Sequence, residues 1–164
     1  MDHRTRHRVA RAHALESSLC ASLLRLGYWC VFPAGGREGE APLWQLPRSS
    51  TQTRAPDLVV LGRGVIELKE SRVSEGCVRL HSHQVRDYVL NWSSLPLPAT
   101  IWICASWGDY RGDVGVMSLE ALARCDIEQE TISLPIMDLY RVGSYRDVEF
   151  TLDAERVGAV LSSI

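Results

Sequence analysis

The sequence predicts one α/β domain in which helices flank a central mixed β-sheet. Apolar residues recur at helical spacing in residues 9–26, two apolar runs meet at a glycine turn within residues 57–69, and a continuous apolar run fills residues 99–105. The chain has 164 residues, which fits a single domain with its own core. We therefore expect residues 1–164 to form one domain, and we find no internal repeat.

Periodicity and turn residues define the first elements. Residues 9–26 form the first predicted helix, and Gly27 ends it in the usual C-terminal role. The apolar positions of this helix are Ala12, Leu15, Leu19, Cys20, Leu23 and Leu26. Residues 1–11 carry arginines and histidines and are predicted to be a flexible basic arm, with a solvated helix start as the alternative. Residues 28–32 predict a short strand. Residues 40–55 have no clear period and predict a long loop, of the kind that is usually functional or disordered.

The middle of the chain carries the clearest hairpin signal. Two strand-like runs, residues 57–61 and 65–68, flank the turn Gly62-Arg63-Gly64. Residues 70–79 are polar and contain a glycine, so they predict a second loop.

The remaining elements complete the sheet and its cover. A helix is expected over residues 81–92, with Ser82 as its N-cap. Residues 99–105 are apolar throughout, which is typical of a central strand buried on both faces. Further elements are predicted as a strand at 113–117, a helix at 118–124, a strand at 132–140 and a helix at 154–162.

The composition indicates a soluble intracellular protein. The chain is 46% hydrophobic and 23% charged, with a formal net charge of -2. No apolar run approaches the roughly 20 residues of a membrane span, and the basic N-terminus lacks an apolar signal core. The five cysteines are scattered without a C-x-x-C pair, which predicts reduced thiols and argues against a zinc or iron–sulfur centre. We expect a cytoplasmic protein that does not contact a membrane.

Three charged residues of the hairpin could carry chemistry. Asp57 begins the first strand, and Glu67 and Lys69 lie on the second strand, where alternate side chains share a face. Lys69 is the only lysine among the 18 lysines and arginines of the chain. Because arginine cannot replace a compact ammonium that exchanges its proton, the survival of one lysine at this place favours a functional role. The alternative is a surface hairpin whose acids and lysine merely pair, an arrangement that contributes little.

Two carboxylates and one ammonium suit phosphodiester hydrolysis. The reaction needs an activated water, neutralised phosphoryl oxygens and a stabilised leaving group, and Mg²⁺ held by carboxylates can supply all three. We expect Asp57, Glu67 and the backbone carbonyl of Leu68 to be metal ligands, with Mn²⁺ able to replace Mg²⁺. Lys69 would orient or deprotonate the attacking water, or neutralise the developing charge. No small-molecule cofactor is expected.

The same residues resemble a nuclease motif. Pro56-Asp57, with Glu67-Leu68-Lys69 beginning ten positions after the aspartate, resembles the motif of the PD-(D/E)xK nuclease superfamily, which implies a restriction-endonuclease-like core. Glu16 on the first helix resembles the glutamate that helps bind metal in archaeal-type Holliday-junction resolvases. The turn Ala34-Gly35-Gly36 is similar to the turn after the next strand of those enzymes. The resemblance therefore adds Glu16 to the expected catalytic and metal-binding residues.

A further resemblance lies downstream of the hairpin. Gln84-Val85-Arg86-Asp87-Tyr88 is similar to the Gln-x-x-x-Tyr motif of RecB-type nucleases, in which the glutamine and tyrosine support the catalytic lysine or the DNA backbone. Gln84 thus joins the expected catalytic residues. The residues expected to contact nucleic acid are Arg37, Arg54, Arg79, His81, His83 and Tyr88. Zinc at His81 and His83 is a weaker alternative, because the pair lacks partnering cysteines.

These features predict a Mg²⁺-dependent DNA endonuclease that is structure-selective and similar to Holliday-junction resolvases. The resemblance implies a homodimer that acts on branched or duplex DNA in recombination. A type II restriction or homing endonuclease on the same core is the second hypothesis, in which the loops at 40–55 and 70–80 would read bases in a groove. A catalytically silent nucleic-acid-binding domain is the third, and the slightly acidic net charge favours it.

Overall fold

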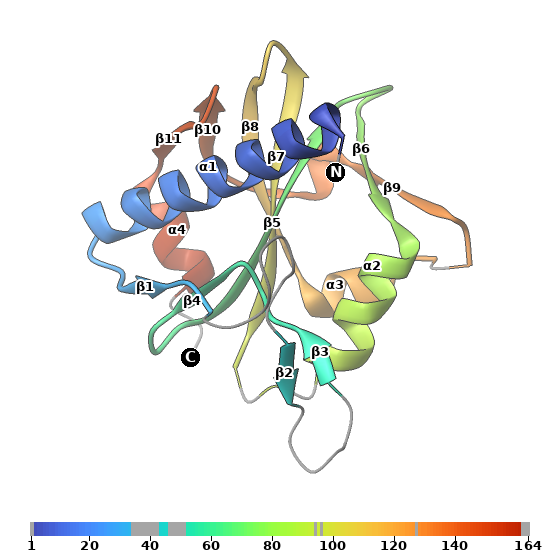
Figure 1. Cartoon of the computed structure of the whole chain (residues 1–164), viewed down its shortest axis with the longest axis horizontal. Helices are drawn as coiled ribbons and strands as arrows, with labels where there is room; N and C mark the ends of the chain where they lie inside the picture. The colour runs from blue at the N-terminus through green and yellow to red at the C-terminus, as the bar shows by residue number, and fades with distance from the viewer. Residues whose placement is uncertain are drawn as a thin grey trace.

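The computed structural model describes residues 2–33, 43–45, 52–93, 95, 97–126 and 128–161. Within these ranges the central sheet has seven strands, in the spatial order β1-β4-β5-β7-β8-β10-β11 (Figure 1). The strands are β1 (Cys30–Val31), β4 (Leu58–Val60), β5 (Gly64–Arg72), β7 (Ala99–Gly108), β8 (Arg111–Ser118), β10 (Tyr140–Arg146) and β11 (Glu149–Leu152). Neighbouring strands are antiparallel except for β5 and β7, which run parallel. The predicted α/β class with a central mixed sheet flanked by helices is confirmed.

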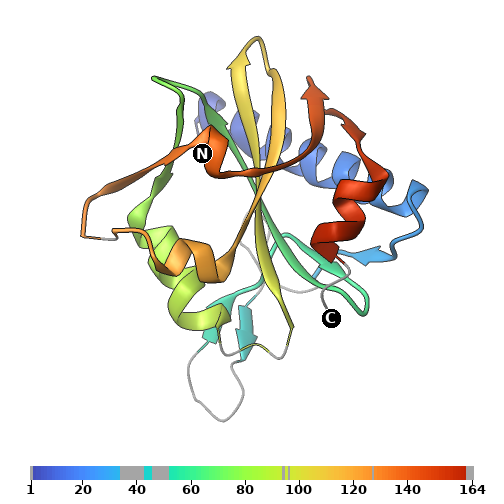
Figure 2. The same ribbon diagram turned by 180° about the vertical axis from the view of Figure 1, so that it is seen from behind.

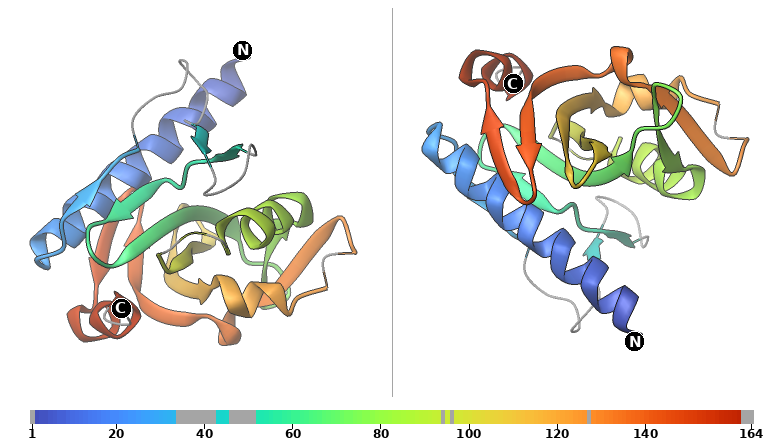
Figure 3. Two further views of the ribbon diagram at one scale, coloured as in Figure 1. Left: turned by 90° about the horizontal axis from the view of Figure 1, so that it is seen from below. Right: turned by 90° about the horizontal axis from the view of Figure 1, so that it is seen from above.

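One side of the sheet is covered by the long first helix. Helix α1 (His3–Arg25) runs across this side (Figures 1 and 3). Its buried leucines, Leu15, Leu19 and Leu23, form one apolar stripe that packs with side chains of β4, β5 and β7. Both edge strands, β1 and β11, also contact α1, so the sheet curls around it. Helix α4 (Ala154–Leu161) contributes to the same core cluster.

Shorter elements cover the other side of the sheet, as the view from behind shows (Figure 2). They are α2 (Ser82–Asp87), the π-helical turn η1 (Tyr88–Trp92), α3 (Leu119–Ala123), the ribbon of β6 (Cys77–His81) with β9 (Thr131–Pro135), and the 3-10 turn η2 (Ile136–Asp138). Strand β7 divides its side chains between two core clusters: Ile101 and Ile103 face these shorter elements, whereas Trp102 and Cys104 face α1. The prediction of a central strand buried on both faces is confirmed.

Residues 3–11 are helical, so the predicted flexible arm is wrong there and the alternative, a solvated helix start, is confirmed. Helix α1 begins at His3, because Asp2 caps it: the Asp2 Oδ1 accepts the backbone N–H of Thr5 at 2.7 Å. Arginine is a good helix former, so the basic residues continue the helix and do not interrupt it. The backbone of this segment is therefore continuous with the rest of α1.

Two predicted loops contain strands. The described parts of the segment 40–55 form β2 (Leu43–Gln45) and β3 (Gln52–Arg54), which pair as a separate two-stranded sheet. The loop predicted at 70–79 is wrong, because β5 continues to Arg72 and β6 begins at Cys77. The polar residues of this segment suggested a loop, but Glu70 lies in a strand, where its charge is paired with Arg11 of α1.

The remaining differences concern a cap and the last strands. Ser82 is the first residue of α2 and not its N-cap, and its hydroxyl donates to the carbonyl of Glu130 at 2.9 Å. Ser118, by contrast, caps α3 as the pattern at residues 118–124 suggests. The single strand predicted at 132–140 is β9 followed by η2 and β10, and β11 was not predicted.

The five cysteines are free thiols, in agreement with the predicted reduced state. Burial raises the pKa of the Cys104 thiol above its usual range. In the portion of the chain that the structure describes, no helix has both the length and the apolar character needed to cross a membrane.

Candidate active site

The hairpin of β4 and β5 brings Asp57 and Glu67 opposite each other. Leu58 pairs with Ile66 in the antiparallel register, so the residue before β4 faces the residue after Ile66. The Asp57 Oδ2 accepts the backbone N–H of Leu68 at 2.7 Å, which anchors this carboxylate against β5. The two acids predicted from the hairpin therefore lie side by side across two strands.

Side chains on β5 alternate as the sequence predicts. Ile66 and Leu68 belong to the core cluster under α1. Glu67 points toward η1, where its Oε1 accepts the hydroxyl of Tyr88 at 2.8 Å and lies 2.6 Å from the ammonium Nζ of Lys69. Only 6% of Glu67 is exposed. The predicted pair of Glu67 and Lys69 thus forms an ion pair in which the glutamate is buried, the lysine is 25% exposed, and a tyrosine supports the glutamate.

Glu16 approaches this group from α1. Its side chain is 17% exposed, and its Oε2 lies 3.4 Å from Nδ1 of His13, one turn earlier on the helix. Burial raises the pKa of Glu16, and the charge of Glu67 raises it further. Glu16 therefore lies close enough to the hairpin to interact electrostatically with its acids.

The electrostatics show an excess of acid. Burial, followed by the charges of Glu67 and Glu16, raises the pKa of Asp57 to about 8. Burial alone would lower the pKa of Lys69, but the adjacent Glu67 and Asp57 outweigh it and raise that pKa above its usual range. Burial, followed by the charge of Glu67, likewise raises the pKa of the Tyr88 hydroxyl. One ammonium thus lies among three acidic side chains, and it remains protonated at neutral pH.

The described residues contain no group of three or more His, Cys, Asp or Glu side chains placed to hold one metal ion. Asp57 and Glu67 are two carboxylates that could share an ion with the Leu68 carbonyl, and Glu16 would have to come closer to join them. The metal ligands predicted from the sequence remain predictions.

The other predicted site residues are spread over the molecule. Gln84 is half-buried on α2, one turn before Tyr88. Tyr88 is 7% exposed and bonded to Glu67, so it lies buried beside the acids of the hairpin. The exposed residues are Arg54 on β3, Arg79 and His81 on β6, and His83 on α2, with the rings of His81 and His83 5.6 Å apart. Arg37 and the turn Ala34-Gly35-Gly36 lie outside the described residues.

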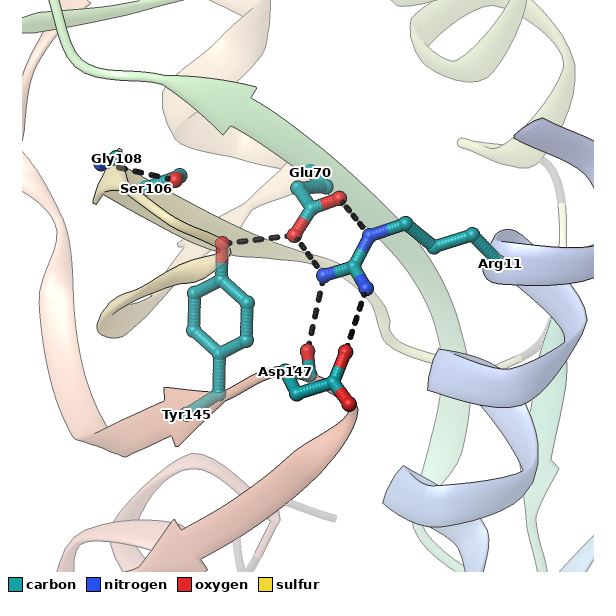
Figure 4. A network of polar contacts seen from close by, with 6 residues as sticks. All are labelled: Arg11, Glu70, Ser106, Gly108, Tyr145 and Asp147. Carbon is teal, nitrogen blue, oxygen red and sulfur yellow. Dashed lines mark hydrogen bonds and ion pairs between the residues drawn. The ribbon is translucent and has the colours of Figure 1, made fainter. Parts of the chain in front are cut away.

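A second polar cluster, which the sequence did not predict, occupies the opposite face of β5 (Figure 4). Arg11 of α1 donates from Nε and Nη2 to the two carboxylate oxygens of Glu70, both at 2.7 Å. It also donates to the Asp147 carboxylate at 3.1 Å and to the Asp147 carbonyl at 2.9 Å. The Tyr145 hydroxyl donates to Glu70 at 2.8 Å, and the Tyr110 ring lies 3.8 Å below the guanidinium. We call these five residues the Arg11 network.

The Arg11 network fixes α1 on the sheet. It connects the helix to β5 through Glu70, to β10 through Tyr145 and to the two hairpin turns that carry Tyr110 and Asp147. The backbone also joins these turns, because the Asp147 N–H donates to the Tyr110 carbonyl at 2.7 Å. The only sign of this network in the sequence is Glu70, the acid directly after Lys69. Its partners Arg11 and Tyr145 lie too far away in the sequence for residue spacing to predict the contacts.

Comparisons with known proteins add a likeness at low identity. No protein-family model matches the chain, and no curated protein matches it significantly. Among solved structures, the chain is similar to the 1.6 Å structure of Hjc from Archaeoglobus fulgidus, a Holliday junction resolvase from an archaeal hyperthermophile. The two share 16% sequence identity with a TM-score of 0.49, over 90% of this chain and 95% of that chain. The function proposed below rests on this chain's own residues.

Proposed function

We propose that the chain is a metal-dependent DNA endonuclease that hydrolyses phosphodiester bonds. The observation that carries the proposal is the group of Asp57, Glu67 and Lys69 on one hairpin, with Glu16 close by. This group holds more carboxylates than cations in a largely buried place, which is costly unless a positive ligand is bound. We further propose that the enzyme is structure-selective, acts on branched DNA in the manner of Holliday-junction resolvases, and works as a homodimer.

The donor set fits Mg²⁺. This ion is commonly bound by one or two carboxylates while it keeps several waters, so a complete protein cage is not needed. Asp57, Glu67 and the Leu68 carbonyl would hold it, and Mn²⁺ could replace it. When bound, the ion would lower the pKa of a water and offset charge on the phosphoryl oxygens. Burial and the neighbouring Glu67 and Glu16 raise the pKa of Asp57 to about 8, and a bound cation would lower it again.

The chain's own residues would orient the reactants. Lys69 keeps its proton beside Glu67, so neutralising the developing charge on the phosphate suits it better than deprotonating water. Tyr88 holds one oxygen of Glu67, and the Leu68 N–H holds one oxygen of Asp57. These two hydrogen bonds fix both carboxylates, which leaves the second oxygen of each for the ion.

Cleavage of a panel of DNAs by single variants tests the proposal. Wild-type protein, Asp57→Asn and Glu67→Gln would be incubated with Mg²⁺ and single-stranded, duplex, flap and four-way DNA. The control variant is Glu155→Gln, which removes an exposed acid from α4. We expect wild type and the control to cut the four-way substrate and both site variants to lose about 100-fold or more of the rate. Undiminished cleavage by either site variant would contradict the mechanism.

The same panel separates the other hypotheses. Discrete fragments from linear duplex would support a restriction or homing endonuclease. Binding of DNA without cleavage of any substrate would support a catalytically silent domain.

A further inference from the structure

A cleft opens next to the candidate active site. It encloses about 470 Å³ between the first half of α1, β5 and the turn after β7. Its lining includes Glu16 and Lys69 at one end and His7, Arg8, Arg11 and Tyr110 further along. The cleft is therefore continuous with the candidate active site.

The lining of the cleft carries positive charge at its surface. His7 and Arg8 are exposed on α1, and the charge of Arg8 acts on the exposed Asp2 at the start of the helix. Arg11, by contrast, has its charge offset by Glu70 and Asp147. Arg8 is thus the arginine of this lining that could meet a phosphate without breaking a buried pair.

The cleft also offers an aromatic ring. Tyr110 is 50% exposed, although its other face packs on the Arg11 guanidinium at 3.8 Å. Arg11 is itself held by four hydrogen bonds to Glu70 and Asp147, so the ring is supported by a rigid base. An exposed aromatic ring that is already positioned can stack a nucleobase with little further loss of entropy.

From this combination we propose that the cleft binds a single-stranded DNA segment next to the scissile bond, with Arg8 on a phosphate and Tyr110 stacked on a base. The inference rests on the proposed nuclease function and names the form of DNA at that site. A basic groove with an aromatic platform is the usual arrangement for single strands. A volume of about 470 Å³ is that of a pocket for a small molecule, so the cleft suits a short segment of one strand better than a whole duplex.

The spacing along α1 agrees with a continuous strand. Arg8 lies eight residues before Glu16, which is about 12 Å along a helix. A stacked strand advances about 3.4 Å per nucleotide, so about three to four nucleotides separate a phosphate at Glu16 and Lys69 from one at Arg8. The segment in the cleft is thus short.

Fluorescence anisotropy with a 12-nucleotide oligo(dT) and a 12-base-pair duplex tests the inference. All proteins carry Asp57→Asn, so that binding is measured without cleavage. Arg8→Gln and Tyr110→Leu alter the cleft, and Arg25→Gln removes an arginine from the last turn of the same helix as the matched control. Thermal melting checks that each variant folds. Because Arg8 is exposed, Arg8→Gln is the cleft substitution that should disturb folding least.

We expect Arg8→Gln to weaken oligo(dT) binding and to reduce the slope of log affinity against log salt by about 0.7, the value for one lost phosphate contact on a single strand. Tyr110→Leu should weaken oligo(dT) binding by about 5- to 100-fold. Arg25→Gln should leave it unchanged, and duplex binding should respond less to both cleft variants.

Equal oligo(dT) affinities for all three variants, or no binding of oligo(dT) at all, would overturn the inference. A preference for duplex that both cleft variants abolish would overturn it too, because the cleft would then hold duplex. The proposed function fails separately, when wild-type protein cuts none of the DNAs in the panel.

Discussion

Glu67 and Glu70 lie three residues apart on β5, yet their surroundings differ. Each accepts a hydrogen bond from a tyrosine at 2.8 Å, Glu67 from Tyr88 and Glu70 from Tyr145. Glu70 has a bidentate arginine partner, whereas Glu67 shares one lysine with Asp57 and Glu16. One face of the strand therefore has its charges balanced inside the protein, and the other has too many acids. The balanced face thus ties α1 to the sheet, and the unbalanced face holds the candidate active site.

Replacing Lys69 should have the largest effect. We expect Lys69→Ala to lower the cleavage rate by about 100- to 1,000-fold, because it removes the cation that would meet the developing charge. The matched control is Arg72→Ala, which removes an exposed cation from the same strand. Single-turnover cleavage of the best substrate in the panel measures both. A rate for Lys69→Ala equal to that of the control would remove the functional difference between the two faces.

Replacing Arg11 should mainly lower stability. Arg11→Ala leaves Glu70 without its partner, and because the two side chains are 12% and 21% exposed we expect a loss of about 2–3 kcal/mol in the free energy of unfolding. Arg141→Ala breaks the more exposed pair with Asp113, and should cost about 0–1 kcal/mol. Urea unfolding measures both values. Equal losses would show that the Arg11 network is no more than a surface pair.

Removing an acid from the unbalanced face should stabilise the metal-free protein. Asp57 has a folded pKa of about 8, above the ordinary value of 3.8, so the folded state binds its proton more tightly than the unfolded chain. The contribution of Asp57 to stability is therefore fully present below pH 4 and is lost as the pH rises through 8. At pH 8.5 we expect Asp57→Asn to unfold at higher urea concentration, with a gain of about 1–2 kcal/mol.

The pH dependence supplies the control for this variant. Asp57→Asn and wild type should have similar stabilities near pH 4, where the aspartate is protonated. A constant difference between pH 4 and pH 8.5 would show that the substitution acts through packing and not through charge.

The two tyrosines give the smallest and most closely matched test. Each Tyr→Phe change deletes one hydroxyl that donates to a glutamate at 2.8 Å. We expect Tyr145→Phe to cost about 1 kcal/mol of stability with cleavage retained. Tyr88→Phe should instead lower the cleavage rate by about 10-fold through a less well oriented Glu67. The reverse pattern would exchange the roles of the two faces.

The sequence predicted the unbalanced face better than the balanced one. Asp57, Glu67 and Lys69 lie within one hairpin, so strand alternation and register were enough to bring them together. Local periodicity likewise predicted α1 from residue 9 onward, and a continuous apolar run predicted β7. Tyr88 was found by its spacing from Gln84, although its contact with Glu67 depends on how η1 packs.

The Arg11 network could not be predicted because its members come from four distant segments. Arg11 and Asp147 are 136 positions apart, and no local pattern links them. The same reason hid the end of β5: a strand residue such as Glu70 resembles a loop residue when its partner is unknown. Contacts between distant segments determine these elements. The same contacts hold the first turns of α1 in place beside the cleft.

Calorimetric titration of Mg²⁺ into the metal-free protein tests the central claim most directly, because it does not depend on the DNA substrate. Wild type, Asp57→Asn and Glu67→Gln would be compared with Glu155→Gln at pH 7 in two buffers of different ionisation enthalpy. We predict saturable binding by wild type and the control, with heat that depends on the buffer because Asp57 releases its proton, and loss of binding in both site variants. The absence of Mg²⁺ binding by wild type, or equal binding by all four proteins, would contradict the account.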